Sequence, residues 1–233
     1  MKRRMFAKRC LHLFPFFPFC LFISCTQDAY EKGEGEYSLM RGDFAEAYVN
    51  TAKEMESVTT DDGELLPLKV NKTAKWVTTA DTTYRCMLYY NKVQDQSGQF
   101  LADAISIGQV PCPRIVPLPE FEKELKTDPV KFESMWLSRT GKYLNMSLQV
   151  MSGHTDDTTA VHQLSFVSDT LMTHADHSRT LHVRLHHDQH QVPAYYSVQA
   201  YVSLLVDSIQ ADSSHFTVNT YNGTVVKTLP LRK

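Results

Sequence analysis

Hydrophobic and polar residues alternate with a period of two over most of the chain beyond residue 41, and turn residues recur at short intervals. This alternation is typical of half-buried β-strands. In the first half of the chain it predicts strands at residues 42–53, 57–60, 65–70, 84–93 and 100–110. The Asp61-Asp62-Gly63 turn between two apolar runs indicates a hairpin. Five short strands in so compact a stretch predict a small, strongly coiled barrel.

A proline-rich break follows, with Pro111, Pro113, Pro117 and Pro119 close together. Proline cannot occupy the interior of a sheet, so the barrel ends here. Residues 120–126 (EFEKELK) then favour a helix of two turns, which Asp128-Pro129 ends. We therefore expect residues 114–129 to form a stiff connector with one short helix.

The period-two pattern resumes after the connector. It predicts seven strands, at residues 130–138, 143–151, 161–168, 180–188, 195–207, 214–221 and 225–229. Seven strands joined by short hairpin turns are the expectation for an immunoglobulin-like β-sandwich. The cysteine pair of true immunoglobulin domains is missing, so the pattern predicts the architecture alone. The fold class is therefore all-β.

The N-terminal 25 residues differ in character from the rest. Five basic residues between Lys2 and Arg9 precede an apolar run at 11–23, and the run stops at Ser24-Cys25. This order is that of an export signal, and a cysteine after a small residue adds a bacterial lipobox in which Cys25 is acylated. Phe22 fills the third position before Cys25, where leucine is usual. The alternatives are an ordinary signal peptide or an uncleaved anchor, although a run broken by Pro15 and Pro18 is too short to span a bilayer.

Cleavage would change the electrostatics of the chain. Residues 1–24 carry five basic and no acidic residues, so a precursor with a formal charge of −2 would become a mature protein with a charge of −7. Such a balance opposes nucleic-acid binding, which depends on cationic contacts to phosphate. Residues 25–36 are polar and acidic and read as a flexible tether. The predicted organisation is thus a signal at 1–24, a tether at 25–36, a barrel at 37–113, a connector at 114–129 and a sandwich at 130–233.

After cleavage, the cysteines left besides Cys25 are Cys86 and Cys112. In an oxidising compartment these two could form a disulfide, or both could remain free thiols. With at most one bridge, the protein is not a disulfide scaffold.

Histidine is the residue type with the most uneven distribution, since nine of the ten lie from His154 onward. On the strand predicted at 180–188, His182 and His186 would share one face with Arg184, while Leu181 and Leu185 face the core. A zinc or copper site would use His182, His186 and His187, with a turn or a neighbouring strand bringing the nitrogens together. A solvated, histidine-rich strand face and a pH response near 6 are the alternatives.

The sequence contains no clear catalytic motif. The sequence has no Gly-x-Ser-x-Gly elbow and no glycine-rich phosphate loop, and Cys86 falls in a strand where a buried, inert thiol is expected. Several aromatic residues could line a ligand groove, although strand aromatics more often fill a core. They are Trp76, Trp136, Tyr89, Tyr90, Tyr195 and Tyr196. These observations predict a protein that is not an enzyme.

Four segments, taken in order and spacing, resemble one family. They are Asp61-Asp62-Gly63-Glu64-Leu65-Leu66-Pro67, Tyr89-Tyr90-Asn91, Trp136-x-x-x-x-Gly141-x-Tyr143-Leu144-Asn145 and Tyr221-Asn222-Gly223. In this arrangement the chain resembles the NigD-like lipoproteins of Gram-negative gut and oral bacteria. The resemblance implies an OB-like N-terminal barrel, an immunoglobulin-like C-terminal sandwich and a lipidated Cys25, and it carries over no catalytic residue. The histidine excess departs from the family pattern.

The sequence therefore predicts a non-enzymatic lipoprotein of the cell envelope, anchored by Cys25 to the outer membrane and either periplasmic or surface-exposed. Its partners would be the membrane, through the lipid, and an envelope protein or a glycan, with no nucleic acid. The alternative is a histidine-rich envelope lipoprotein that binds zinc or copper.

Overall fold

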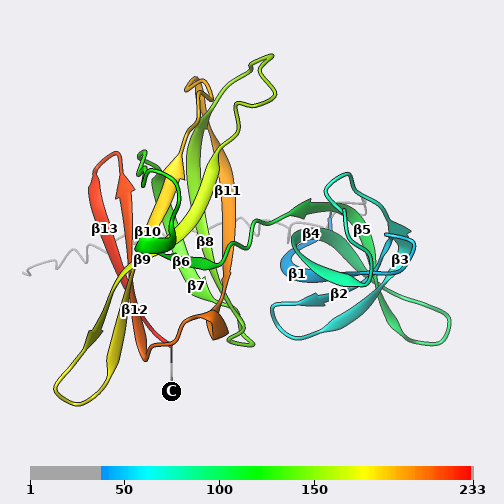
Figure 1. Ribbon diagram of the computed structural model, residues 1–233. Coiled ribbons are helices and arrows are strands. Elements are labelled where there is room, and N and C mark those ends of the chain that lie inside the picture. The colour runs from blue at the N-terminus through cyan, green and yellow to red at the C-terminus, as the bar shows by residue number, and fades with distance from the viewer. Residues whose placement is uncertain (1–37, 232–233) are drawn as a thin grey trace, which may run out of the picture. The chain divides into compact units, whose positions relative to one another are not determined.

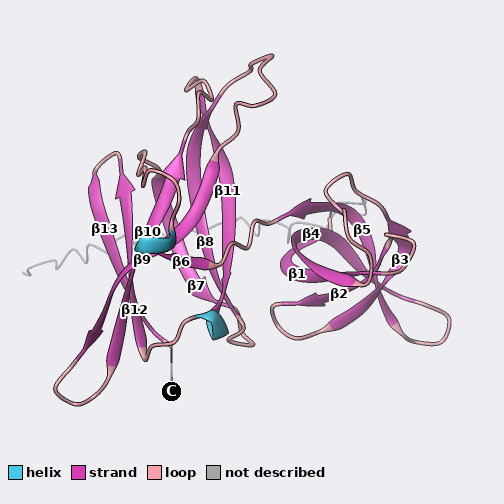
Figure 2. Ribbon diagram, viewed as in Figure 1, coloured by secondary structure: helices cyan, strands magenta, loops and turns pink. Residues whose placement is uncertain are grey.

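The computed structural model describes residues 38–231, and nearly all regular structure in that range is β (Figure 2). No helix among these residues is long and apolar enough to cross a membrane. The predicted signal, the tether and Cys25 lie outside the described residues.

The N-terminal half is a closed five-stranded barrel (Figure 1). Its strands are β1 (Arg41–Val49), β2 (Met55–Thr60), β3 (Leu65–Lys72), β4 (Thr82–Gln94) and β5 (Phe100–Gln109). They follow the order β1-β2-β3-β5-β4, and β4 pairs back onto β1. The pairing of β3 with β5 is parallel and completes the closure, as in an OB-like barrel. All five strands predicted from the alternation are confirmed.

Alternation along β1 and β4 divides their side chains between the barrel core and its outer face. The core side carries Ala45, Ala47, Val49, Cys86, Leu88 and Tyr90, all buried. The outer side carries Phe44 and Glu46 on β1 beside Met87 and Arg85 on β4, because the register pairs Phe44 with Met87 and Glu46 with Arg85. An arginine and a glutamate thus sit next to each other on the outer face.

The C-terminal half is a sandwich of a five-stranded and a three-stranded sheet (Figure 1). The larger sheet has the order β13-β12-β10-β9-β6, and the smaller has the order β11-β8-β7. Their strands are β6 (Ile115–Pro117), β7 (Lys131–Leu137), β8 (Tyr143–Ser152), β9 (Gln163–Thr173), β10 (Arg179–Asp188), β11 (Tyr196–Leu205), β12 (Ser213–Thr220) and β13 (Gly223–Pro230). The seven predicted strands are confirmed, and β6 is an addition.

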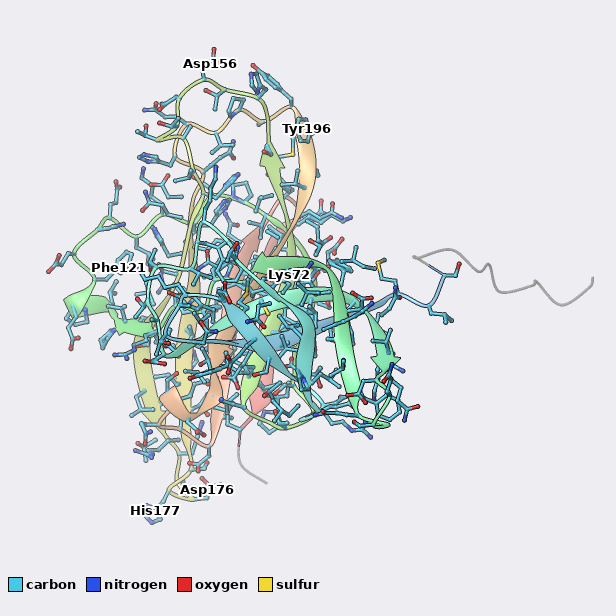
Figure 3. All side chains as sticks on the ribbon, turned by 90° about the vertical axis from the view of Figure 1, so that its right-hand side faces the viewer. Lys72, Phe121, Asp156, Asp176, His177 and Tyr196 are labelled. Carbon is cyan, nitrogen blue, oxygen red and sulfur yellow. The ribbon has the colours of Figure 1, made fainter. Side chains whose placement is uncertain are left out.

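Apolar side chains of the two sheets fill the space between them, among them the buried Leu148, Phe166 and Phe216. The opposite, outer face of the small sheet is polar and aromatic. It carries Ser134 and Trp136 from β7, Tyr143, Asn145, Ser147 and Gln149 from β8, and Gln199, Tyr201 and Ser203 from β11. Asp156 and Tyr196 lie at one end of the sandwich, and Asp176 and His177 lie at the other (Figure 3).

The helix predicted at residues 120–126 is wrong. The connector contains one 3-10 turn, Leu118–Glu120, and the residues that follow have no helical structure. Their backbone groups bond to β10 instead, because His187 N donates to Lys126 O and Asp128 N donates to His187 O. So short an isolated helix is marginal in water, and tertiary contacts decide the conformation. Ile115–Pro117 also pairs in parallel with β9, so the connector forms an edge of the sandwich.

Candidate functional site

The outer face of β1 and β4 lies against the outer face of the small sheet, and Arg85 is at the centre of the contact. Its side chain is 3% exposed. Nη1 lies 2.7 Å from Asp61 Oδ1, Nη2 donates to Asp61 Oδ2 at 2.7 Å and to Asn145 Oδ1 at 2.9 Å, and Nε donates to Ser203 Oγ at 3.1 Å. Asp61 belongs to the barrel, whereas Asn145 and Ser203 belong to the sandwich. One guanidinium thus joins the two domains, as its fork of donors permits.

The partners of Arg85 are also bonded to each other. Asn145 Nδ2 donates to Asp61 Oδ2 at 2.7 Å, and Ser203 Oγ donates to Asn145 Oδ1 at 2.7 Å. The guanidinium also lies over the Tyr143 ring, with Cζ 4.0 Å from the ring centre. Each polar group in this buried cluster orients another, and such networks favour one arrangement of the groups they join.

Glu46 forms a second polar contact beside the first. Tyr143 Oη donates to Glu46 Oε1 at 2.6 Å, and Lys142 Nζ donates to the same atom at 2.6 Å. Burial alone would raise the pKa of Glu46, but the hydrogen bonds from Lys142 and Tyr143 hold that pKa below its usual value. Burial and the neighbouring Glu46 raise the pKa of Tyr143. At neutral pH the contact is therefore a carboxylate held by a phenol and an ammonium.

An aromatic cluster continues the contact on the side away from Glu46. Phe44 meets Trp136 edge to face at a centroid distance of 5.5 Å and Tyr201 at 5.2 Å. Beyond these rings the two domains leave a groove of about 440 Å³. Its lining consists of Gly42, Asp43, Phe44, Asp61, Met87, Ser134, Trp136, Ser147 and Tyr201. A concave site with aromatic walls and a few polar groups is the usual form of a ligand site.

Two of the four segments that carried the family resemblance meet at this contact. Asp61 comes from the first segment, and Trp136, Tyr143 and Asn145 come from the third. The expectation that strand aromatics fill a core holds for Tyr90, which is fully buried, whereas Trp136 lines the groove and Tyr195 is exposed.

The sequence did not identify Arg85 as a residue of the site. The one feature of the sequence that points to Arg85 is its position, since it is a charged residue in an apolar strand directly before Cys86.

The structure does not bring His182, His186 and His187 together. His182 meets His215 on the neighbouring strand at a centroid distance of 4.8 Å. His186 and His187 are consecutive on β10 and so point to opposite faces. Among residues 38–231, no group of three or more histidine, cysteine, aspartate or glutamate side chains is arranged to hold a metal ion.

The solvated strand face expected for the histidines is also wrong for His186, which is 2% exposed. The connector covers it. Phe121 meets its ring edge to face at 4.9 Å, and Lys126 N donates to His186 Nδ1 at 3.1 Å. On the other side of the strand, His187 Nδ1 donates to Asp128 O at 2.9 Å, and its Nε2 lies 3.0 Å from His162 Nδ1. His186 and His187 of β10 therefore hold the connector against the sandwich.

Lowering the pH should weaken this contact between the connector and the sandwich. Burial lowers the pKa of His186 and of His162 below the usual value near 6.5. The unfolded chain therefore binds more protons than the folded one as the pH falls through 6.5, and stability is lost in that direction. We expect a lower free energy of unfolding at pH 5.5 than at pH 7.5 in urea titrations.

In the same titrations His186→Gln should show a smaller difference between the two pH values. The matched control, His177→Gln in the exposed loop, should keep the full difference. Equal free energies at both pH values in the unmodified protein would contradict this role of the buried histidines.

Cys86 and Cys112 are both free thiols in the structure, and the proposed disulfide between them stays a prediction. The Cys86 thiol donates to Ala45 O at 3.4 Å inside the barrel. Burial raises its pKa to about 12. A thiol in this environment is inert rather than nucleophilic.

Together, the fold and this contact define a two-domain β protein in which an OB-like barrel is joined to an immunoglobulin-like sandwich through a buried arginine. Residues 114–228 match the NigD-like C-terminal beta sandwich domain. The sandwich therefore carries the C-terminal domain of NigD-like proteins, the family that the sequence segments indicated.

Solved structures share the fold over both domains. A NigD-like immunity protein from Bacteroides caccae matches with a TM-score of 0.64 at 23% identity, over 80% of this chain and 91% of that chain. A candidate lipoprotein from Bacteroides fragilis matches with a TM-score of 0.58 at 10% identity, over 83% of this chain and 98% of that chain. A search of curated proteins found no match.

Proposed function

We propose that the protein is a lipid-anchored, non-enzymatic protein of the cell envelope that binds a partner through the groove between its two domains. The observation that carries the proposal is the combination of a buried Arg85 cluster with an open aromatic groove directly beside it. The Arg85 cluster fixes the walls of the groove. A groove whose walls are held before binding costs less conformational entropy on binding.

Envelope placement is supported by three observations. The N-terminal segment has the order of a lipoprotein signal ending at Cys25. The NigD-like family resemblance implies a lipidated cysteine at that position. One structure with the same fold is described as a candidate lipoprotein. Attachment through the lipid would leave both β domains free to meet a partner in the periplasm or outside the cell.

We favour a binding role over catalysis because the side chains that could react are already held by hydrogen bonds or are buried. Asp61 is held by Arg85 and Asn145, and Asp43 accepts a hydrogen bond from Tyr90 Oη at 2.9 Å. The Cys86 thiol is buried in the barrel. An immunity protein with this fold, from Bacteroides caccae, is consistent with a role in binding. No observation favours the metal-binding alternative at His182, His186 and His187.

The proposal is tested by binding of the labelled, lipidated protein to isolated cell envelopes. We expect saturable binding that Ser134→Glu weakens at least tenfold, because the new carboxylate stands in the groove on an exposed position that supports no core packing. Lys75→Glu on the barrel surface is the control, and it should bind as the unmodified protein does. Binding that does not saturate, or that Ser134→Glu leaves unchanged, would overturn the proposal.

A further inference from the structure

We infer that the groove takes a neutral glycan chain, which lies across the outer face of the small sheet between Trp136 and Tyr201. This inference rests on the proposed binding function and names its ligand class.

Trp136 and Tyr201 offer aromatic surfaces to a ligand in the groove. Trp136 and Tyr201 are half-buried, and both rings make edge-to-face contacts with Phe44, which is 9% exposed. The rings therefore keep their orientation in the absence of a ligand. One face of a pyranose ring is made of C–H groups, and such an apolar face packs on a fixed aromatic ring. Tyr89, with 37% exposure, extends the aromatic surface beside Gly42.

The polar groups next to these rings are hydroxyls and amides. Gln199 Nε2 donates to Ser147 Oγ at 2.6 Å, and Ser147 Oγ donates to Glu133 Oε2 at 3.1 Å. Ser134 is exposed on the neighbouring strand. Both hydrogens of Gln199 Nε2 are used, the second by Leu148 O at 3.0 Å, whereas the exposed Ser134 hydroxyl can both donate and accept. Alternating donors and acceptors on a sheet face match the hydroxyl groups of a sugar chain.

The charge of the groove selects among glycans. None of the residues that line it is basic, and its two carboxylates belong to Asp43 and Asp61. The nearby Lys131 is paired with Glu133 at 3.6 Å. Arg85 neutralises Asp61, so Asp43 is the carboxylate that an anionic glycan would meet, and no lining residue offers that glycan a cation. Like charges repel. A neutral chain meets no such penalty.

A basic peptide is the competing ligand, because carboxylates and aromatic rings attract cations. Two observations favour the glycan. Asp61 is already neutralised by Arg85, and Asp43 already accepts the Tyr90 hydroxyl. In addition, extended peptides commonly add to a free strand edge, whereas the groove lies on a sheet face, where the backbone groups are paired within the small sheet.

The test measures binding of the lipidated protein, kept in detergent, by affinity electrophoresis and titration calorimetry. The probes are neutral polysaccharides (a β-glucan, an α-glucan, a mannan and a galactan), an acidic polysaccharide (polygalacturonate) and a basic peptide (oligolysine). We expect at least one neutral polysaccharide to bind, and Trp136→Ala to weaken that binding at least tenfold. Tyr195→Ala, which removes an aromatic ring with 77% exposure outside the groove, is the matched control and should bind normally.

Ser134→Glu provides a second variant that leaves the aromatic packing intact, in case Trp136→Ala unfolds, and it should weaken the same binding. Absence of binding to every neutral polysaccharide overturns the glycan inference, as does binding that neither variant alters. If cell envelopes still bind through the groove while no neutral polysaccharide does, the glycan inference fails and the proposed function stands. If oligolysine binds in preference to every glycan, the ligand is a basic peptide and the inference is likewise overturned.

Discussion

Replacing Arg85 with alanine should lower the free energy of unfolding by about 3–5 kcal/mol, the usual effect of removing one partner from a buried ion pair. Asp61 would remain with a side chain only 18% exposed and without its cation. Asn145 and Ser203 would each lose a hydrogen bond from the guanidinium. The loss therefore combines an uncompensated carboxylate with two lost hydrogen bonds.

Urea unfolding at pH 7.5 measures the change. The matched control is Arg184→Ala, because Arg184 also pairs with an aspartate, Asp169, but its side chain is 47% exposed. An exposed pair contributes only about 0–1 kcal/mol, so this variant should unfold close to the unmodified protein. Equal effects of the two substitutions would show that Arg85 is not the centre of the contact between the domains.

Replacing Cys25 with alanine should abolish lipid attachment completely. The reason is chemical, since acylation in a lipobox requires the cysteine sulfur and alanine offers no nucleophile. Metabolic labelling with a clickable fatty acid in a Gram-negative host, followed by gel fluorescence, measures the change. The unmodified protein should carry label, and the Cys25→Ala variant should carry none.

Cys20→Ala is the control for this labelling, because Cys20 lies within the apolar run of the signal and is expected to leave with it. It should retain full label. Protease treatment of intact cells then separates the two sides of the membrane, since only a surface-exposed protein is digested. Label that persists in Cys25→Ala, or that is missing from the unmodified protein, would contradict the anchor.

The strands of both domains could be predicted from the sequence because apolar side chains, which point into a domain core, alternate with more polar ones along most of them. The alternation Ala45, Ala47, Val49 in β1 and Leu144, Met146, Leu148 in β8 records which side chains point inward. Where an element depends on a distant surface, the local pattern misleads. Residues 120–126 have helical composition, yet β10 takes their backbone hydrogen bonds and the chain stays extended.

The candidate site was accessible to sequence reasoning only in part. Trp136 was named among groove candidates, and Asp61, Tyr143 and Asn145 were in the segments that carried the resemblance. What no local pattern contains is the pairing of Arg85 with residues 60 and 118 positions further along the chain. The burial of His186 could not be predicted either, because the connector that covers this side chain is remote in sequence.

The buried Arg85 cluster should hold the two domains in one fixed arrangement, which forms the groove. Nitrogen-15 relaxation of the protein in detergent, read separately for the barrel and the sandwich, measures whether the two tumble together. We expect one rotational correlation time for both domains, and two different times once Arg85 is replaced by alanine. Two different times in the unmodified protein would show that the domains move independently, and the groove would lose its fixed walls.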